Sequence, residues 1–258
     1  MTEILKADNI SKTFRLSAKQ RRLEHTDTKV RVAVSNMSFT AYEGEIFGLL
    51  GPNGAGKTTT LRMLSTLIKP DGGDVCINGT SVLNNPEAAR KEIGFLTSEL
   101  KLEEFFTPNY LFNFFSDLHQ VPQDVREQRK KYLFEKFGID KFAEVKVANL
   151  STGMKQKTSL VISIVHDPDI IIFDEPTNGL DVLTAKVVTD FILELKEQGK
   201  SIIVSSHIFS LIEKICDRVG IIVDGRMMKC DTLENIMDGK SLEDRFFEIY
   251  AEGKGNEK

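Results

Sequence analysis

The segment "GPNGAGKTT", residues 51–59, decides the fold class of this chain. It matches the pattern Gly-x4-Gly-Lys-[Ser/Thr], in which glycines let successive backbone N–H groups converge on phosphate oxygens. The apolar run "IFGLL" precedes the segment, and "TTTLRMLSTLI" continues from it with helical spacing of its apolar residues. Because a strand leads into the loop and a helix leaves it, the pattern indicates a phosphate-binding loop and not an ordinary glycine-rich turn.

Two side chains of this loop have chemical roles of their own. Lys57 would reach the β and γ phosphates of a nucleoside triphosphate, and Thr58 would offer its hydroxyl to Mg²⁺. The phosphates would otherwise be surrounded by Gly51, Pro52, Asn53, Gly54, Ala55, Gly56 and Thr59. We therefore expect ATP and Mg²⁺ to bind at this loop.

A second segment, "DIIIFDEP" at residues 169–176, reads as a buried apolar strand that ends in two carboxylates. Ligands of parallel α/β sheets gather at the carboxyl ends of the strands, where Asp174 and Glu175 would lie. We expect Asp174 to bind Mg²⁺, through water, and Glu175 to polarise the attacking water as general base. Behind a phosphate-binding loop, this pair indicates nucleotide hydrolysis.

A third segment, "SIIVSSH" at residues 201–207, is an apolar run that ends in His207. A lone histidine is more often a structural residue. On a strand next to that of Glu175, His207 could instead donate a hydrogen bond to the γ phosphate. Both interpretations stay open at the level of these residues alone.

The bulk composition is ordinary for a soluble globular protein. Of 258 residues, 41% are apolar and 28% are charged, which suits one large α/β domain. A net charge of −4 gives no indication of nucleic-acid binding, and no nucleic-acid partner is expected. The cysteines Cys76, Cys216 and Cys230 are far apart, so neither a metal site nor a disulfide framework is indicated.

No stretch of the sequence approaches the roughly 20 apolar residues that a membrane span needs, and the N-terminus lacks the layout of a signal peptide. A role at a membrane would therefore require docking onto other subunits. The segment between Leu16 and Arg31 is basic, with Lys19, Arg21, Arg22, Lys29 and Arg31. We interpret it as a solvated hairpin tip, with a contact to lipid headgroups or to a partner subunit as the alternative.

Four motifs in order, "GPNGAGKTT", "LSTGMKQK", "IIIFDEPTNGLD" and "VSSH", resemble the Walker A, signature, Walker B with D-loop, and switch-histidine motifs of ATP-binding cassette (ABC) ATPases. The resemblance covers roughly residues 3–230. It implies an α/β fold: a RecA-like P-loop NTPase core with an antiparallel β subdomain and a helical subdomain. It also implies a head-to-tail dimer that holds two ATP molecules at its interface.

The resemblance implies a domain division. A single ABC ATPase domain would cover residues 1–240, and a polar tail would cover residues 241–258. Within the domain, the core and β subdomain would take about 1–98 and 158–230, and the helical subdomain about 99–157.

The resemblance also assigns roles to residues outside the phosphate-binding loop. Ser151 and Gly153 of the signature would contact the γ phosphate of the ATP bound to the partner. Asp181 would couple the two sites through the D-loop, and His207 would sense the γ phosphate. Phe14 stands where the family usually has an aromatic residue stacked on adenine, although it could also be a core phenylalanine.

The sequence departs from the family pattern at two motifs. Where the family usually has the Q-loop glutamine, this chain has Ser98 followed by Glu99. Either Glu99 or a water links to Mg²⁺, or the link between nucleotide state and partner subunit is altered. In the signature, Thr152 replaces a glycine and Met154 replaces a glutamine, which would weaken or reshape the contact in trans.

These departures, with the basic segment, are similar to the sodium-export branch of bacterial transporter ATPases. We therefore expect the ATPase subunit of an exporter, with Na⁺ as one candidate substrate, on the cytoplasmic face of the membrane. Its partners would be transmembrane permease subunits and a second ATPase subunit, identical in a homodimer. The alternatives are a non-transport ABC ATPase acting on ribosomes or DNA, and a P-loop kinase, in which "LSTGMKQK" and "SSH" would have no role.

Overall fold

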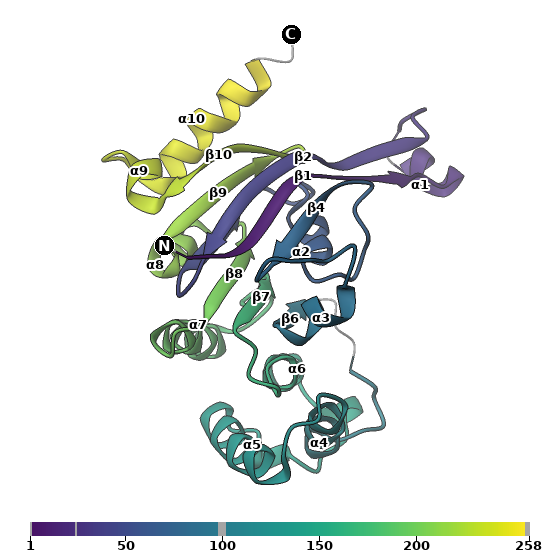
Figure 1. The fold of residues 1–258 in the computed structure, drawn as a ribbon, viewed down its shortest axis with the longest axis vertical. Coiled ribbons are helices and arrows are strands. Elements are labelled where there is room, and N and C mark those ends of the chain that lie inside the picture. The colour runs from purple at the N-terminus through teal and green to yellow at the C-terminus, as the bar shows by residue number, and fades with distance from the viewer. Residues whose placement is uncertain (1, 24, 98–101, 256–258) are drawn as a thin grey trace.

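The computed structural model describes residues 2–23, 25–97 and 102–255. Figure 1 shows two sheets in the upper part of the molecule and a group of helices at its lower end. The strands are β1 (Glu3–Arg15), β2 (Val30–Tyr42), β3 (Ile46–Leu50), β4 (Gly72–Ile77), β5 (Thr80–Ser81), β6 (Ile93–Thr97), β7 (Ile170–Asp174), β8 (Ser201–Ser206), β9 (Arg218–Val223) and β10 (Arg226–Thr232).

The helices separate these strands along the chain. They are α1 (Ala18–Leu23), α2 (Lys57–Leu64), α3 (Pro86–Lys91), α4 (Pro108–Leu118), α5 (Gln123–Phe137), α6 (Thr152–Ser163), α7 (Val182–Glu197), α8 (Phe209–Ile215), α9 (Leu233–Met237) and α10 (Leu242–Gly255), with 3₁₀ turns η1 (Asp140–Phe142) and η2 (Val147–Asn149). Within the described ranges, no helix has the length and apolar character that a membrane span needs.

The larger sheet has the strand order β10-β9-β3-β8-β7-β6, and all of its strands except β10 run parallel. Its central strands are in register: Leu50 at the end of β3 lies opposite Ser206, and Asp174 at the end of β7 lies opposite Ser205. The carboxyl ends of the central strands therefore meet at one edge, where the loops that follow them can form a shared site.

The parallel sheet is buried on both faces, and successive residues of each strand enter different cores. Ile203 and Ile172 pack with the antiparallel sheet and α2. Val204 and Phe173 pack with α7, α8 and the lower helices. This alternation follows from the two-residue repeat of a strand, and it explains why these strands read as unbroken apolar runs.

The smaller sheet, with the order β2-β1-β4-β5, is antiparallel throughout. Its β1–β2 hairpin extends outward to α1 at the upper right of Figure 1, and none of the residues of α1 is buried. The basic segment is therefore a hairpin tip. Together, the parallel core, the antiparallel β subdomain and the helices confirm the predicted fold class.

The helices α4 and α5, with η1 and η2, form the helical subdomain, which contacts α6 at the lower end of the molecule. Aromatic side chains fill its interior: Phe112 is fully buried and meets the ring of Phe134 edge to face, with 5.5 Å between ring centroids. Phe112, Phe134 and Phe137 thus supply a core, whereas other aromatic residues of this part, such as Phe114, stay exposed.

The expectation of a polar tail over residues 241–258 is wrong for the part that the structure describes. Leu242, Phe246 and Ile249 lie on one face of α10 and are buried in the core that also holds α8. Their spacing of four and three residues is the repeat of a helix, and the charged residues between them obscured it in the sequence.

The aromatic core of the helical subdomain gives a stability prediction. Phe112→Ala removes a fully buried ring and should lower the free energy of unfolding by about 3–5 kcal/mol. Phe114→Ala on the same helix is the matched control: its ring is 49% exposed, so the change should stay within about 1 kcal/mol. Denaturant unfolding of both variants measures the difference, and equal losses would contradict the packing described.

Candidate active site

The phosphate-binding loop joins β3 to α2 and lies tightly against β2. Gly56 has a φ of 102°, and a Cβ at this position would lie 2.4 Å from the carbonyl oxygen of Ala33. Only glycine fits both the left-handed backbone and the close strand. The helix α2 begins at Lys57, directly after Gly56, and the N–H groups of a helix's first turn can bind an anion.

Lys57 is held at the mouth of the loop by three oxygen partners. Its ammonium donates to the carbonyl oxygens of Gly51 at 2.7 Å and Pro52 at 3.2 Å, and lies 3.3 Å from a carboxylate oxygen of Glu175. The side chain is buried, so these partners replace the water that the charge loses. A cation fixed in this position can bind phosphate oxygens.

Asp174 is almost completely buried at the end of β7, beside hydroxyl groups from two other elements. Its Oδ1 accepts a hydrogen bond of 2.6 Å from the Ser205 hydroxyl and one of 3.1 Å from the Thr58 hydroxyl. Parallel pairing of β7 with β8 places Ser205 opposite Asp174. The two predicted metal ligands, Thr58 and Asp174, are therefore brought together.

Glu175 follows directly and turns out of the strand with a φ of 51°, which is unusual for a residue other than glycine. Its backbone N–H donates to Ser205, with the carbonyl oxygen at 3.2 Å and the hydroxyl at 3.1 Å. His207 Nδ1 lies 3.0 Å from both carboxylate oxygens. Lys57, Glu175 and His207, from three separate segments, thus form one cluster, and His207 is part of the site.

A cavity of about 430 Å³ lies beside this cluster and is lined by its Lys57 and Glu175. Phe14 lines it and is 40% exposed, so Phe14 is not a core residue. The cavity is lined by Phe14, Leu16, Gln20, Arg31, Ala33, Pro52, Asn53, Gly54, Gly56, Lys57, Thr58, Thr59, Glu175 and Asn178. Five of these, Leu16, Gln20, Arg31, Ala33 and Asn178, were not predicted.

The signature residues do not line this cavity. Ser151 is exposed and caps α6 by accepting a hydrogen bond from the Met154 N–H at 3.3 Å, and Gly153 lies in the first turn. One chain therefore does not join Ser151 and Gly153 to its own phosphate-binding loop. The Q-loop positions Ser98 and Glu99 lie outside the described residues.

Asp181 caps α7. Its carboxylate accepts from the N–H groups of Leu183 and Thr184 and from the Thr184 hydroxyl, and these hydrogen bonds lower the pKa of Asp181. The next two residues, Val182 and Leu183, are 84% and 78% exposed. The D-loop thus ends in an ordered cap with two apolar side chains in solvent.

The donors at the end of β7 fit Mg²⁺. Carboxylate and hydroxyl oxygens are the ligands that this ion takes, and it commonly keeps several waters and binds substrate phosphates as well. Across the described ranges, no three or more His, Cys, Asp or Glu residues gather into a metal-binding group. The site of Thr58 and Asp174 therefore suits an ion held mainly by nucleotide and water.

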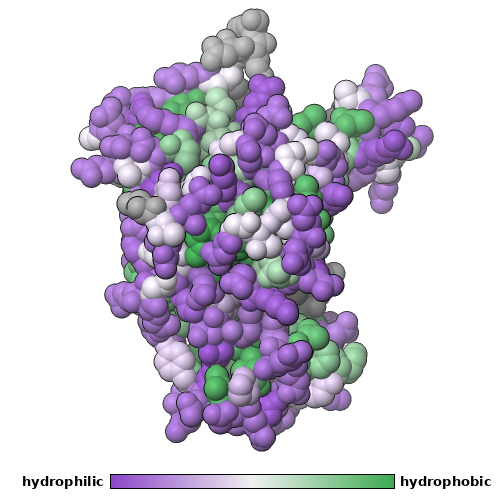
Figure 2. All heavy atoms as spheres, viewed as in Figure 1, coloured by the Kyte–Doolittle hydropathy of each residue, from purple (hydrophilic) through white to green (hydrophobic). Residues whose placement is uncertain are grey.

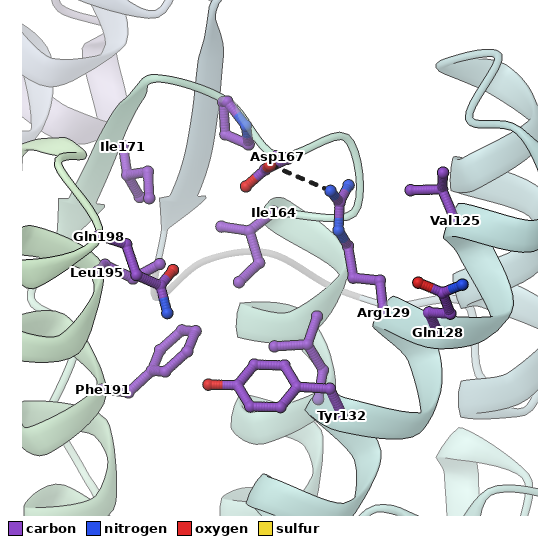
Figure 3. A pocket seen from close by; sticks show the side chains of 12 residues that line it. Val125, Gln128, Arg129, Tyr132, Ile164, Asp167, Ile171, Phe191, Leu195 and Gln198 are labelled. Atoms are coloured by element: carbon purple, nitrogen blue, oxygen red, sulfur yellow. Dashed lines mark ion pairs between the residues drawn. The ribbon is translucent and has the colours of Figure 1, made fainter.

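A second cavity, of about 330 Å³, lies between α5 and the segment that includes α7, away from this cluster (Figure 3). Arg129 spans it to pair with Asp167 at 3.1 Å, and also donates to the carbonyl oxygen of Val165 at 2.6 Å. These contacts of Arg129 link α5 of the helical subdomain to the loop that precedes β7.

Comparisons with known proteins agree with this geometry. A family model described as ABC transporter matches residues 34–178. The ABC transporter ATP-binding protein NatA of Bacillus subtilis is 36% identical over 84% of this chain and 88% of its own length. The Nod factor export ATP-binding protein I of Burkholderia lata is 36% identical over 76% of this chain and 64% of its own length.

Two solved structures are similar to this chain over most of its length. An ATP-binding subunit of an ABC transporter has a TM-score of 0.83 at 27% identity, covering 96% of this chain and 99% of the other. A dimeric ATP-binding cassette, MJ0796, bound to ADP and Pi has a TM-score of 0.78 at 23% identity, covering 89% and 99%. The second likeness is evidence of the fold alone.

The hydrogen bond from Ser205 to Asp174 gives a prediction about Mg²⁺. Ser205→Ala removes a donor that orients Asp174, so we expect a several-fold higher Mg²⁺ concentration for half-maximal ATP hydrolysis. Ser206→Ala is the matched control, because this neighbouring buried hydroxyl accepts from the Ile208 N–H instead. Magnesium titrations of both variants test the idea, and equal shifts would show that burial alone matters.

Proposed function

Since this chain belongs to the ABC transporter family and is an ATPase that hydrolyses ATP for transport, we propose that it drives an exporter, as a dimer docked onto separate transmembrane subunits. The observation that carries the catalytic part of the proposal is the cluster of Lys57, Glu175 and His207 beside the buried Asp174.

Each residue of the cluster has a distinct chemical role in this proposal. The loop N–H groups and Lys57 bind the phosphates of ATP. Asp174 and Thr58 hold Mg²⁺, which when bound offsets the charge of the phosphates. Glu175, beside the Lys57 ammonium, accepts the proton of the attacking water.

His207 contributes a contact that changes during the cycle. A neutral imidazole carries one N–H, so a hydrogen bond from Nδ1 to Glu175 and a donation to the γ phosphate require different protonation or orientation. The side chain is 39% exposed and can turn. We propose that it leaves Glu175 to bind the γ phosphate once ATP is in place.

The second half of each site comes from the partner chain in this proposal. Ser151 and Gly153 stand at the start of α6, where N–H groups and a hydroxyl can bind phosphate, but lie outside their own cavity. The exposed Val182 and Leu183 next to Asp181 offer apolar surface for a dimer contact. One of the similar structures is a dimeric cassette, and we propose a dimer for this chain too.

The surface for the permease lies on the helical subdomain. Figure 2 shows hydrophobic residues gathered at the lower end of the molecule within a mostly hydrophilic surface. Exposed apolar and aromatic side chains follow the stretch that contains Ser98 and Glu99, namely Phe105, Tyr110, Phe114 and Leu118. Such a patch suits a membrane-subunit loop or helix, and we place the transporter contact here, at the cytoplasmic face.

The direction of transport is inferred from relatives. The Nod factor relative carries export in its name, and NatA is a transporter ATP-binding protein. We propose export for this chain too, with Na⁺ as the candidate substrate. The compact spacing from Lys57 to Asp174 leaves no room for the long inserted segment of DNA-repair relatives, which favours transport over the alternative on ribosomes or DNA.

Glu175→Gln tests the catalytic proposal. Without the general base, ATP hydrolysis by the purified complex should fall by about 10²-fold or more while ATP binding is retained. Glu194→Gln is the control, because this carboxylate bonds Tyr132 and Lys136, none of which lines the nucleotide cavity. The hydrolysis rate of this variant should stay close to that of the wild type. A Glu175→Gln complex that releases phosphate at the wild-type rate would contradict the assignment of Glu175 as general base.

Gly153→Asp tests the site in trans. A Cβ at Gly153 would lie 3.8 Å from Thr184 Oγ1, which is an ordinary van der Waals contact. The monomer can therefore accept a larger side chain at this position. The new carboxylate should repel the partner's γ phosphate, abolishing hydrolysis while ATP still binds each monomer. Lys57→Ala serves as the converse control, which should lose ATP binding itself. Loss of monomer binding in Gly153→Asp would argue against a site in trans.

A further inference from the structure

The strand β2 brings a basic residue to the nucleotide cavity that no motif includes. Arg31 and Ala33 are alternate residues of β2, so their side chains lie on the same face of the strand, and both line the cavity. The strand is pressed against the loop, because a Cβ on Gly56 would lie 2.4 Å from the Ala33 carbonyl oxygen. The backbone of Arg31 is thus fixed relative to the phosphate-binding loop.

The guanidinium group of Arg31 reaches the middle of the loop. Its Nη2 lies 3.5 Å from the position that a Cβ on Gly54 would take. Across the β1–β2 ladder, Arg31 is paired with Phe14, the residue proposed to stack on adenine. Arg31 therefore lies between the base end of the cavity and the loop that surrounds the phosphates.

The phosphate chain of ATP would need a second cation on the Gly54 side of the loop. Among the described lining residues, the charged side chains are Arg31, Lys57 and Glu175. Lys57 is paired with Glu175 and bonded to two loop carbonyls at the far end. A triphosphate chain carries more negative charge than Lys57 and a bound Mg²⁺ together would balance, and a guanidinium group matches phosphate oxygens with two parallel donors.

The hairpin next to Arg31 is closed by its own hydrogen bonds. The base of the hairpin is closed by a hydrogen bond of 2.9 Å from the Leu16 N–H to the Lys29 carbonyl oxygen. Ser17 and Gln20 then cap α1 reciprocally: the Ser17 N–H donates to the Gln20 side chain, and the Gln20 N–H donates to the Ser17 hydroxyl. Leu16 and Gln20 also line the cavity, so the hairpin forms one of its walls.

We propose that Arg31 is a substrate-binding residue that holds the phosphate chain of ATP from the Gly54 side of the loop, opposite Lys57. The inference rests on the proposed ATP hydrolysis and gives the basic segment a role in it. Arg31 approaches the loop at Gly54, whereas Glu175 lies beside Lys57 and His207, so we expect Arg31 to act on ATP affinity and not on the chemical step.

Steady-state ATP hydrolysis by Arg31→Gln tests the proposal. Loss of one charged, paired contact should raise KM for ATP about tenfold and leave kcat within about twofold. Arg31→Lys should give an intermediate KM, and the Arg31→Gln defect should shrink as salt is raised, since the contact is partly exposed. Arg22→Gln is the matched control: it removes an exposed arginine of the same hairpin that does not line this cavity, and should leave KM unchanged.

Two outcomes would overturn the proposal. One is an equal KM for Arg31→Gln and Arg22→Gln. The other is that Arg31→Gln weakens inhibition by adenosine as much as it raises KM for ATP. Adenosine has no phosphate, so that result would place the contact on the base. If Arg31→Gln lowers the melting temperature, the KM of Arg31→Lys decides, because lysine keeps the charge and much of the bulk. A KM for Arg31→Lys equal to that of Arg31→Gln would then contradict the proposal. The proposed function is tested separately. If the wild type hydrolyses ATP and Lys57→Ala does not, the proposed function stands even where the Arg31 proposal fails.

Discussion

In-register pairing of the parallel strands β3, β8 and β7 is the constraint on which the site depends. It places Asp174 opposite Ser205, so a single hydroxyl can bond both the buried carboxylate and the N–H of Glu175. A slip of one residue would turn these side chains to the opposite face of the sheet. The apolar residues that fill both cores thus also fix the geometry of the polar edge.

Much of the fold could be predicted because its signals are local. The loop at residues 51–59 fixes a strand and a helix, and the runs around Ile172 and Ile203 have the composition of strands buried on both faces. The helix α10 was missed because its buried face has only three apolar positions among charged residues. The helical spacing of these positions was present in the sequence, but three positions do not show whether a helix packs on the domain or lies in solvent.

Site residues that belong to a sequence motif were predicted, and those that only the tertiary fold brings to the site were missed. Lys57, Asp174, Glu175 and His207 meet as expected. Ser205 could have been noticed as a polar residue at the end of an apolar strand. Arg31 could not, because its position at the loop depends on a close approach of β2 that involves backbone atoms and leaves no mark in side-chain type.

The division of the interior into two cores has a consequence for how such a chain can change. One core joins the sheet to α2 and the antiparallel sheet, and the other joins it to the helices at the lower end and α10. Substitutions at alternate positions of a strand therefore affect the packing on opposite faces of the parallel sheet. The surface of the helical subdomain can therefore diversify, or be grafted from a relative, while the residues around the phosphate-binding loop are inherited intact.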